Sequence, residues 1–201
     1  MKKIFLAGDY RHNNGPCNVN RSIIFNSDAH LCYLKFNNSV LRKIEFVIRI
    51  IFSQIVLISG GLSRGYLNIA RLFNKRIVYL MHGCLRYENE VNKQGKPESI
   101  LKLEDLWLEY ADEIVAVSEK YAEWVKQRYP KYASKITYVN NGVDIVRRAK
   151  VKKHKGEIAV SGGNRGIKNN EIVCKAVEKL NNEGVKCHLI IYGRQYANSF
   201  D

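Results

Sequence analysis

Three loops in this sequence combine glycine with polar or basic side chains, and each follows a short apolar run. The first contains Asn13-Asn14-Gly15-Pro16, the second is Met81-His82-Gly83, and the third runs from Ser161 to Lys168. In open α/β sheets, ligands bind at the carboxyl ends of the strands, where such loops lie. The three loops are therefore the candidate binding sites of the chain.

The chemistry of these loops suits a ligand that carries phosphate. Gly15 has no side chain to keep a phosphate from the backbone N–H groups of a following helix, whose dipole favours an anion. In the third loop, Gly163 permits close approach, and Arg165 and Lys168 supply positive charge for a diphosphate. His82 can hydrogen-bond a substrate hydroxyl. Each loop also has an alternative interpretation. The first could be an ordinary strand-to-helix turn, His82 in the second could be structural, and the third could be a solvated basic loop.

The elements around these loops alternate between short apolar runs and segments of helical period. This alternation is typical of parallel strands joined by crossover helices, and it predicts an α/β fold with a Rossmann-like, doubly wound parallel sheet. Strands are expected at about 3–8, 30–36, 54–59, 76–81, 114–117 and 136–139.

Two of the expected helices have a well-defined apolar face. On the first, the face comprises Val40, Ile44, Val47, Ile48 and Ile51. The same helix carries basic residues on its other side, so it either packs on the sheet or lies on an anionic membrane. On the second, the residues expected to face the core are Ile100, Leu103, Leu106, Trp107 and Tyr110.

The organisation changes after the turn at Asn140-Asn141-Gly142. Six of the nine residues from Arg147 to Lys155 are Lys or Arg, which is typical of a solvated linker. A new strand, helix and strand follow before the chain ends. We therefore expect an N-terminal domain over 1–145, a basic linker over 146–155, and the beginning of a second Rossmann-like domain, incomplete with its two strands, over 156–201.

Composition narrows the possible classes of protein. The 201 residues are 46% hydrophobic and carry a net charge of +14, which excludes a disordered tail and attracts anionic partners. Neither a G-x-G-x-x-G nor a G-x-x-x-x-G-K-[ST] motif is present, which disfavours a dehydrogenase or a P-loop enzyme. Five cysteines without a zinc-like spacing predict small core residues in a reduced, cytoplasmic setting. No apolar stretch is long enough to span a bilayer.

Three passages together resemble the hallmark region of the retaining glycosyltransferases of family 4, which have the GT-B fold. They run from Ala111 to Glu119, from Arg128 to Pro130, and from Lys135 to Asp144. In that family an AD-x-I-x-x-x-S strand is followed by an NG-V-D turn that leads to the nucleotide-binding domain. The loops at Asn14-Gly15-Pro16 and Met81-His82-Gly83 sit where the family has its first glycine loop and its histidine loop. Gly162 to Lys168 is similar to its G-x-x-x-K diphosphate loop.

The resemblance implies transfer of a sugar from a nucleotide diphosphate sugar to a glycan or lipid-linked acceptor, with retention, in surface polysaccharide or glycolipid assembly. It implies that His82 is the catalytic residue and contacts the donor sugar. Gly15 and Gly163 would bind the donor phosphates, and Arg165 and Lys168 would neutralise the diphosphate. No metal and no other cofactor is implied. The implied location is the cytoplasm, with peripheral contact at the inner face of an anionic membrane.

Two alternative hypotheses remain open from the sequence. The family carries an E-x-x-x-x-x-x-x-E pair later in its second domain, and this chain stops before that region, so the protein could be a catalytically inactive fragment or a binding module. The charge of +14 also allows a basic, Rossmann-like nucleic-acid-binding protein. The basic stretch lacks the interleaved aromatic residues that bind single strands, so no specific nucleic-acid partner is expected.

Overall fold

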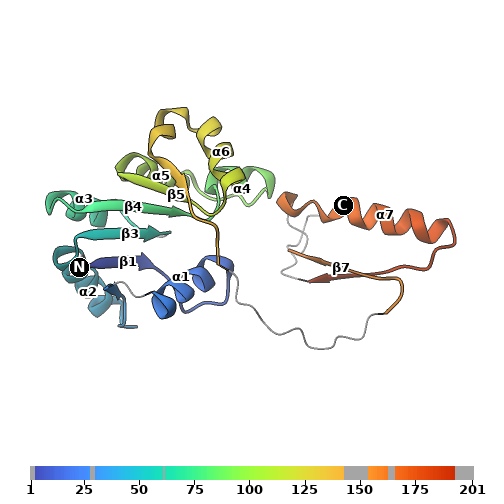
Figure 1. Ribbon diagram of the computed structural model, residues 1–201, viewed down its shortest axis with the longest axis horizontal. Helices are drawn as coiled ribbons and strands as arrows, with labels where there is room; N and C mark the ends of the chain where they lie inside the picture. The colour runs from blue at the N-terminus through green and yellow to red at the C-terminus, as the bar shows by residue number, and fades with distance from the viewer. Residues whose placement is uncertain (1–2, 28–29, 61, 143–153, 163–165, 193–201) are drawn as a thin grey trace. The chain divides into compact units, whose positions relative to one another are not determined.

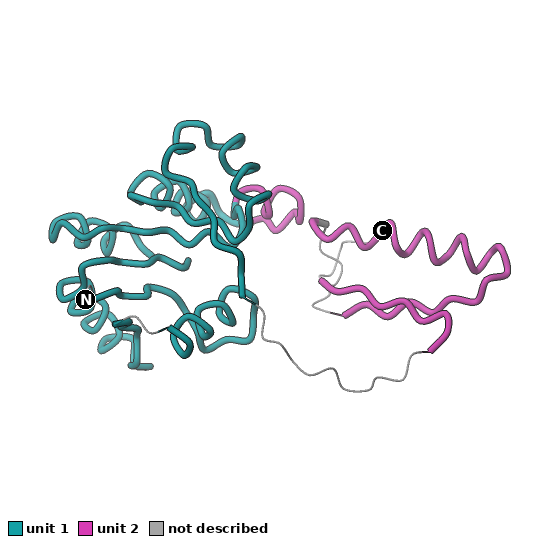
Figure 2. The backbone as a smooth tube through the Cα atoms, viewed as in Figure 1, with its two compact units in different colours: residues 1–85, 96–143 teal, residues 86–95, 144–201 magenta. Residues whose placement is uncertain are grey.

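A computed structural model describes residues 3–27, 30–60, 62–142, 154–162 and 166–192. The chain divides into two compact units, one formed by residues 1–85 and 96–143 and the other by residues 86–95 and 144–201 (Figure 2). The predicted linker at 146–155 falls mostly outside the described residues, so the predicted domain boundaries stay predictions.

The first unit is built on a six-stranded parallel sheet (Figure 1). All six predicted strands are present, with the spatial order β2-β1-β3-β4-β5-β6. This topology confirms the α/β fold class and the Rossmann-like sheet. The strands are β1 (Ile4–Gly8), β2 (Leu31–Tyr33), β3 (Ile55–Ser59), β4 (Arg76–Met81), β5 (Glu113–Ala116) and β6 (Ile136–Tyr138).

Helices connect the strands and cover the sheet. Three of them begin at a side chain that caps the first turn: Asn14 accepts from Cys17 N, Asn38 accepts from two backbone N–H groups, and Ser118 accepts from Tyr121 N. Such caps satisfy donors that the first turn leaves without a helical partner. The helices of this unit are α1 (Gly15–Asn26), α2 (Ser39–Phe52), α3 (Arg64–Leu72), α5 (Glu98–Tyr110), α6 (Glu119–Arg128) and the 3-10 helix η1 (Pro130–Lys135); α4 (Leu85–Val91) belongs almost entirely to the other unit.

The core of the first unit lies between the central strands and their helices. Phe5, Val56 and Ile114 of the sheet are fully buried. Phe46 of α2 contacts Phe5 edge-on and stacks on Tyr66 of α3, so α2 and α3 pack together against β1. The central strands read as nearly continuous apolar runs because helices cover a parallel sheet.

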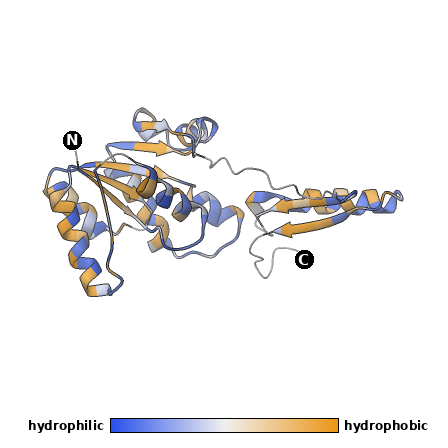
Figure 3. Cartoon of the chain, turned by 60° about the horizontal axis from the view of Figure 1, so that its bottom comes forward, coloured by the Kyte–Doolittle hydropathy of each residue, from blue (hydrophilic) through white to orange (hydrophobic). Residues whose placement is uncertain are grey.

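The helix predicted around residues 40–51 is confirmed as α2, but its apolar stripe does not face the sheet. Val40, Ile44 and Ile48 are 62%, 52% and 47% exposed, and apolar and polar residues alternate along the helices (Figure 3). The face toward the sheet instead includes Ile50 and the buried carboxylate of Glu45. Glu45 can be buried because it accepts hydrogen bonds from the backbone N–H groups of Lys35 and Phe36 and pairs with Arg49.

The core-facing side predicted for the helix around residue 107 is partly wrong. Trp107 is buried as expected, and its indole N–H donates to the Leu62 carbonyl at 2.7 Å. Ile100, however, is 42% exposed, and the buried positions of α5 include Leu101 and the carboxylate of Glu104. The apolar pattern missed Glu104 because a charged residue is rarely fully buried.

The second unit contains the predicted strand, helix and strand. These are β7 (Glu157–Ser161), α7 (Asn170–Asn182) and β8 (His188–Tyr192), with a short 3-10 helix η2 (Gly166–Lys168) before α7. The strands pair in parallel, from Glu157 opposite His188 to Ser161 opposite Tyr192. The backbone N–H of Ile167 donates to Asn92 Oδ1 at 3.0 Å, so residues from the 86–95 segment pack within this unit.

Two further expectations concern the cysteines and the membrane. None of the five cysteines, all of which lie within the described residues, forms a disulfide; Cys17 and Cys84 are buried, as expected for core residues, and the others are half-buried. Among the described residues, no helix combines the length and the apolar character needed to cross a bilayer.

Candidate functional site

The candidate site of the first unit lies at the carboxyl ends of β1, β3 and β4. In the sheet order, β1 has β2 on one side and β3 on the other, so the chain winds in opposite directions from this point. Loops at the carboxyl ends of such strands diverge and leave a crevice, which is where open α/β sheets bind ligands. The last residues of the three strands are Gly8, Ser59 and Met81, and His82 follows directly.

Gly8 allows α1 to approach this edge closely. A Cβ atom on Gly8 would lie 2.7 Å from Asn20 Nδ2 and 2.8 Å from the Cβ atom of Ser59. Both distances are shorter than side-chain atoms tolerate, so a larger residue would push α1 or β3 away. Glycine at this position therefore brings the Asn20 side chain against the ends of the strands.

A chain of hydrogen bonds links Asn20 to Ser59 and His82. Asn20 Nδ2 donates to the Asp9 carbonyl at 2.7 Å, and the Ser59 hydroxyl donates to Asn20 Oδ1 at 2.6 Å. Ser59 Oγ also lies 2.7 Å from His82 Nε2. Because the single Ser59 proton is directed at Asn20, Ser59 accepts from His82, so Nε2 of the imidazole carries a proton.

This assignment leaves one ring nitrogen of His82 able to accept a hydrogen bond. With the proton on Nε2, Nδ1 of the neutral ring carries a lone pair that can accept a hydrogen bond from a ligand hydroxyl. His82 is half-buried, and burial lowers its pKa from the ordinary value of 6.5. The imidazole is therefore neutral at pH 7.

A buried polar group holds the loop that carries His82. Glu104 of α5 is fully buried and accepts a hydrogen bond from Leu85 N at 2.6 Å. Sγ of the buried Cys84 lies 3.2 Å from the Tyr129 hydroxyl. These contacts fix the segment that follows His82, so the imidazole is anchored both by Ser59 and by the loop behind it.

Gly15 lies at the first position of α1, next to the Asn14 cap. It is exposed, and no described atom lies within 4 Å of where its Cβ would be. The first turn of α1, which lies wholly within the described residues, carries no acidic side chain. The positive end of the helix dipole is therefore open to an anion at Gly15.

The other predicted site residues belong to the second unit. Lys168 ends η2 and is exposed, and its side-chain stem lies over Gly162: a Cβ there would be 2.5 Å from Lys168 Cγ. Gly162 has φ +104°, a backbone conformation that glycine adopts readily. Gly163 and Arg165 lie outside the described residues, so their roles stay predictions.

Sequence reasoning missed Asn20 and Ser59. The signal for Ser59 was present, because it ends an apolar strand beside the strand that leads to His82. Asn20 gave no such signal, because a polar residue inside a helix is ordinarily exposed. Only the close contact at Gly8 explains why it is buried.

The topology and the polar edge define a Rossmann-like α/β domain with a candidate ligand site at the point where the sheet changes winding direction. The family model of Glycosyltransferase Family 4 matches residues 19–147. The chain therefore belongs to glycosyltransferase family 4. No curated protein matches it.

Proposed function

We propose that the chain acts in the transfer of a sugar from a nucleotide diphosphate sugar to a glycan or lipid-linked acceptor, with retention, in surface polysaccharide or glycolipid assembly. The observation that carries this proposal is the series of hydrogen bonds from Asn20 through Ser59 to His82, in a domain of glycosyltransferase family 4. It orients a neutral imidazole whose Nδ1 can accept from a hydroxyl of the donor sugar.

The donor phosphates are assigned to backbone and basic groups. Gly15 offers its own backbone N–H at the start of α1, where no described atom lies within 4 Å of the position of a Cβ. Gly163, Arg165 and Lys168 form the proposed diphosphate loop, in which the two cations stabilise the negative charge that develops as the nucleoside diphosphate leaves. Fixed cations can do this without a metal ion, so the proposed transfer needs no metal or other cofactor.

The proposed acceptor side includes contact with the inner, cytoplasmic face of an anionic membrane. Val40, Ile44, Ile48 and Phe52 follow one another at four-residue spacing along α2, and all are exposed. This spacing makes one apolar stripe, and Lys43 is exposed on the same helix. An apolar stripe on a chain of net charge +14 suits a surface that is both anionic and apolar below its headgroups.

The membrane contact is tested with vesicles of neutral and of anionic lipids. The chain is expected to sediment with the anionic vesicles, and Ile44→Asp combined with Ile48→Asp is expected to abolish this. Ile172→Asp is the matched control, because Ile172 is 62% exposed on α7. Equal binding by all three proteins, or no binding by the unmodified chain, would contradict the contact.

The transfer itself is tested by incubating the chain with nucleotide sugars and lipid-linked or oligosaccharide acceptors and detecting the released nucleoside diphosphate. We expect release with one class of donor and its loss in His82→Ala. Binding without release would favour the alternative of an inactive fragment or binding module. Tight, steeply salt-dependent binding to a DNA or RNA duplex would instead favour a nucleic-acid-binding protein.

A further inference from the structure

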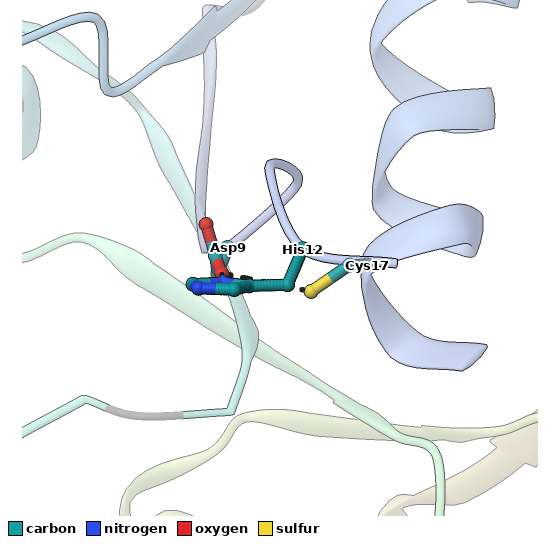
Figure 4. Close-up of side chains that lie close together, drawn as sticks. All are labelled: Asp9, His12 and Cys17. Atoms are coloured by element: carbon teal, nitrogen blue, oxygen red, sulfur yellow. Dashed lines mark hydrogen bonds and ion pairs between the residues drawn. The ribbon is translucent and has the colours of Figure 1, made fainter. Parts of the chain in front are cut away.

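A second group of reactive side chains lies at the end of β1, outside the Asn20–Ser59–His82 chain. Asp9, His12 and Cys17 come from the loop after β1 and the first turn of α1, and their side chains converge (Figure 4). One ligand atom from each lies within 4.8 Å of the others. In the sequence they form D-x-x-H-x-x-x-x-C, which differs from the common zinc-binding runs of cysteine and histidine.

The sulfur and carboxylate oxygen already have a spacing that suits a metal ion. Cys17 Sγ lies 3.7 Å from Asp9 Oδ2. In a tetrahedral zinc site, bonds of about 2.3 Å to sulfur and about 2.0 Å to oxygen place these two atoms about 3.5 Å apart. His12 Nδ1 hydrogen-bonds the same carboxylate oxygen. The His12 side chain is 78% exposed, so the ring can move outward to admit an ion.

The backbone that carries the three side chains is held in place. Asn20 donates to the Asp9 carbonyl, and Arg21 donates to the carbonyl groups of Tyr10 and His12 at 3.0 and 3.2 Å. The Asn14 side chain accepts from Cys17 N at 3.0 Å. These hydrogen bonds hold the backbone of the loop and of the first turn of α1, so binding an ion would require movement mainly in the His12 ring.

The type of each ligand selects the ion. We propose that Asp9, His12 and Cys17 bind a zinc ion, with the fourth position open on the solvent side of His12. Sulfur, nitrogen and one carboxylate suit Zn²⁺, whereas Mg²⁺ and Ca²⁺ require oxygen ligands. A thiolate and a carboxylate together carry two negative charges, which balance the ion. The sugar transfer proposed above does not require this ion, and zinc binding is tested by a separate measurement.

The test uses the full chain, stripped of metal by a chelator and kept reduced with a phosphine. Zn²⁺ is titrated in competition with a chromophoric chelator, and Co²⁺ is used as a spectroscopic probe. We expect one ion per chain and a thiolate-to-cobalt charge-transfer band. Cys17→Ser should remove the band, and Asp9→Asn, His12→Gln and Cys17→Ser should each weaken Zn²⁺ binding at least about tenfold, the smallest loss usual for supporting residues.

Matched controls are Cys32→Ser and His30→Gln, which change a half-buried cysteine and an exposed histidine outside the cluster. Both should bind Zn²⁺ as the unmodified chain does. Because His12 is exposed, His12→Gln should fold normally and decides the question even if Cys17→Ser is unstable. Absence of Zn²⁺ binding by the unmodified chain, or unchanged affinity in His12→Gln, would overturn the proposal. A cobalt complex without the thiolate band would also overturn it.

Discussion

The hydroxyl oxygen of Ser59 lies 2.7 Å from Nε2 of His82, across the carboxyl ends of two neighbouring parallel strands. Ser59 is buried and gives its own proton to Asn20, so this contact sets which ring nitrogen of His82 is protonated. A feature of the fold thereby determines the chemistry that the candidate catalytic residue can perform.

Replacing Ser59 tests whether this hydrogen-bond chain stabilises the fold. Ser59→Ala leaves Asn20 Oδ1 and His82 Nε2 without their partner in a buried setting, so we expect a loss of about 1–3 kcal/mol in the free energy of unfolding. Urea denaturation measures it. The control is Ser63→Ala, because Ser63 is exposed and makes no capping hydrogen bond; it should change stability by less than about 0.5 kcal/mol. Equal effects of the two substitutions would contradict the account.

Two glycine substitutions separate a packing role from a ligand role. Gly8→Ala places a Cβ 2.7 Å from Asn20 Nδ2 and 2.8 Å from Ser59 Cβ, so it should destabilise the chain by about 1–3 kcal/mol. Gly15→Ala meets no described atom within 4 Å. It should leave thermal stability unchanged or slightly raised and weaken the binding of a nucleoside diphosphate. A Gly15→Ala variant that binds the nucleotide normally would argue against the phosphate site.

The pH dependence of stability should report the burial of His82. Its pKa is lowered from 6.5 by burial, so the unfolded chain takes up this proton more readily than the folded chain. The contribution of His82 to stability is therefore fully present above about pH 6.5 and is lost as the pH falls from there through the lower folded pKa. As the pH is lowered over this range, the melting temperature of the unmodified chain should fall more steeply than that of His82→Gln.

The control for this pH profile is His30→Gln, because His30 is exposed. It should keep the slope of the unmodified chain. If His82→Gln showed that same slope, His82 would not be the group that titrates.

Glu45 of α2 should stabilise the chain through the hydrogen bonds that its carboxylate accepts from backbone N–H groups. Burial alone would raise its pKa, but hydrogen bonds from the Phe36 and Lys35 backbone and from Arg49 outweigh burial and lower the pKa from 4.5. Glu45→Gln should cost about 1–3 kcal/mol at pH 7. The difference from the unmodified chain should shrink as the pH falls below about 4.5. Urea denaturation at pH 7 and below about pH 4.5 measures this difference in the free energy of unfolding. Glu123→Gln is the control, because Glu123 is exposed, and it should show no such difference.

The sequence predicts the strands well because parallel strands are buried and leave a plain signal. The run ending at Ser59 and the run before His82 were both expected where β3 and β4 lie. Helical periodicity shows that Val40, Ile44 and Ile48 share a face, yet it cannot tell which face packs. The buried face differs from the expected one because the backbone N–H groups of Lys35 and Phe36, which precede α2, satisfy the charge of Glu45.

The candidate site shows a similar limit. Gly15 and His82 were identified from local pattern, since glycine and histidine after a strand are visible in a short window. Asn20 and the Asp9–His12–Cys17 group depend on where α1 sits against β1, which is a tertiary contact. No local rule predicts that Gly8 brings α1 within reach of Ser59.

The most direct test of the account measures whether His82 contacts the sugar of the donor. Isothermal titration calorimetry of the unmodified chain and of His82→Ala should be carried out with a nucleotide sugar and with the matching nucleoside diphosphate. We expect the unmodified chain to bind both, and His82→Ala to lose about tenfold in affinity for the nucleotide sugar alone, the loss expected for one hydrogen bond. No binding of any nucleotide sugar, or an equal loss for both ligands, would contradict the account.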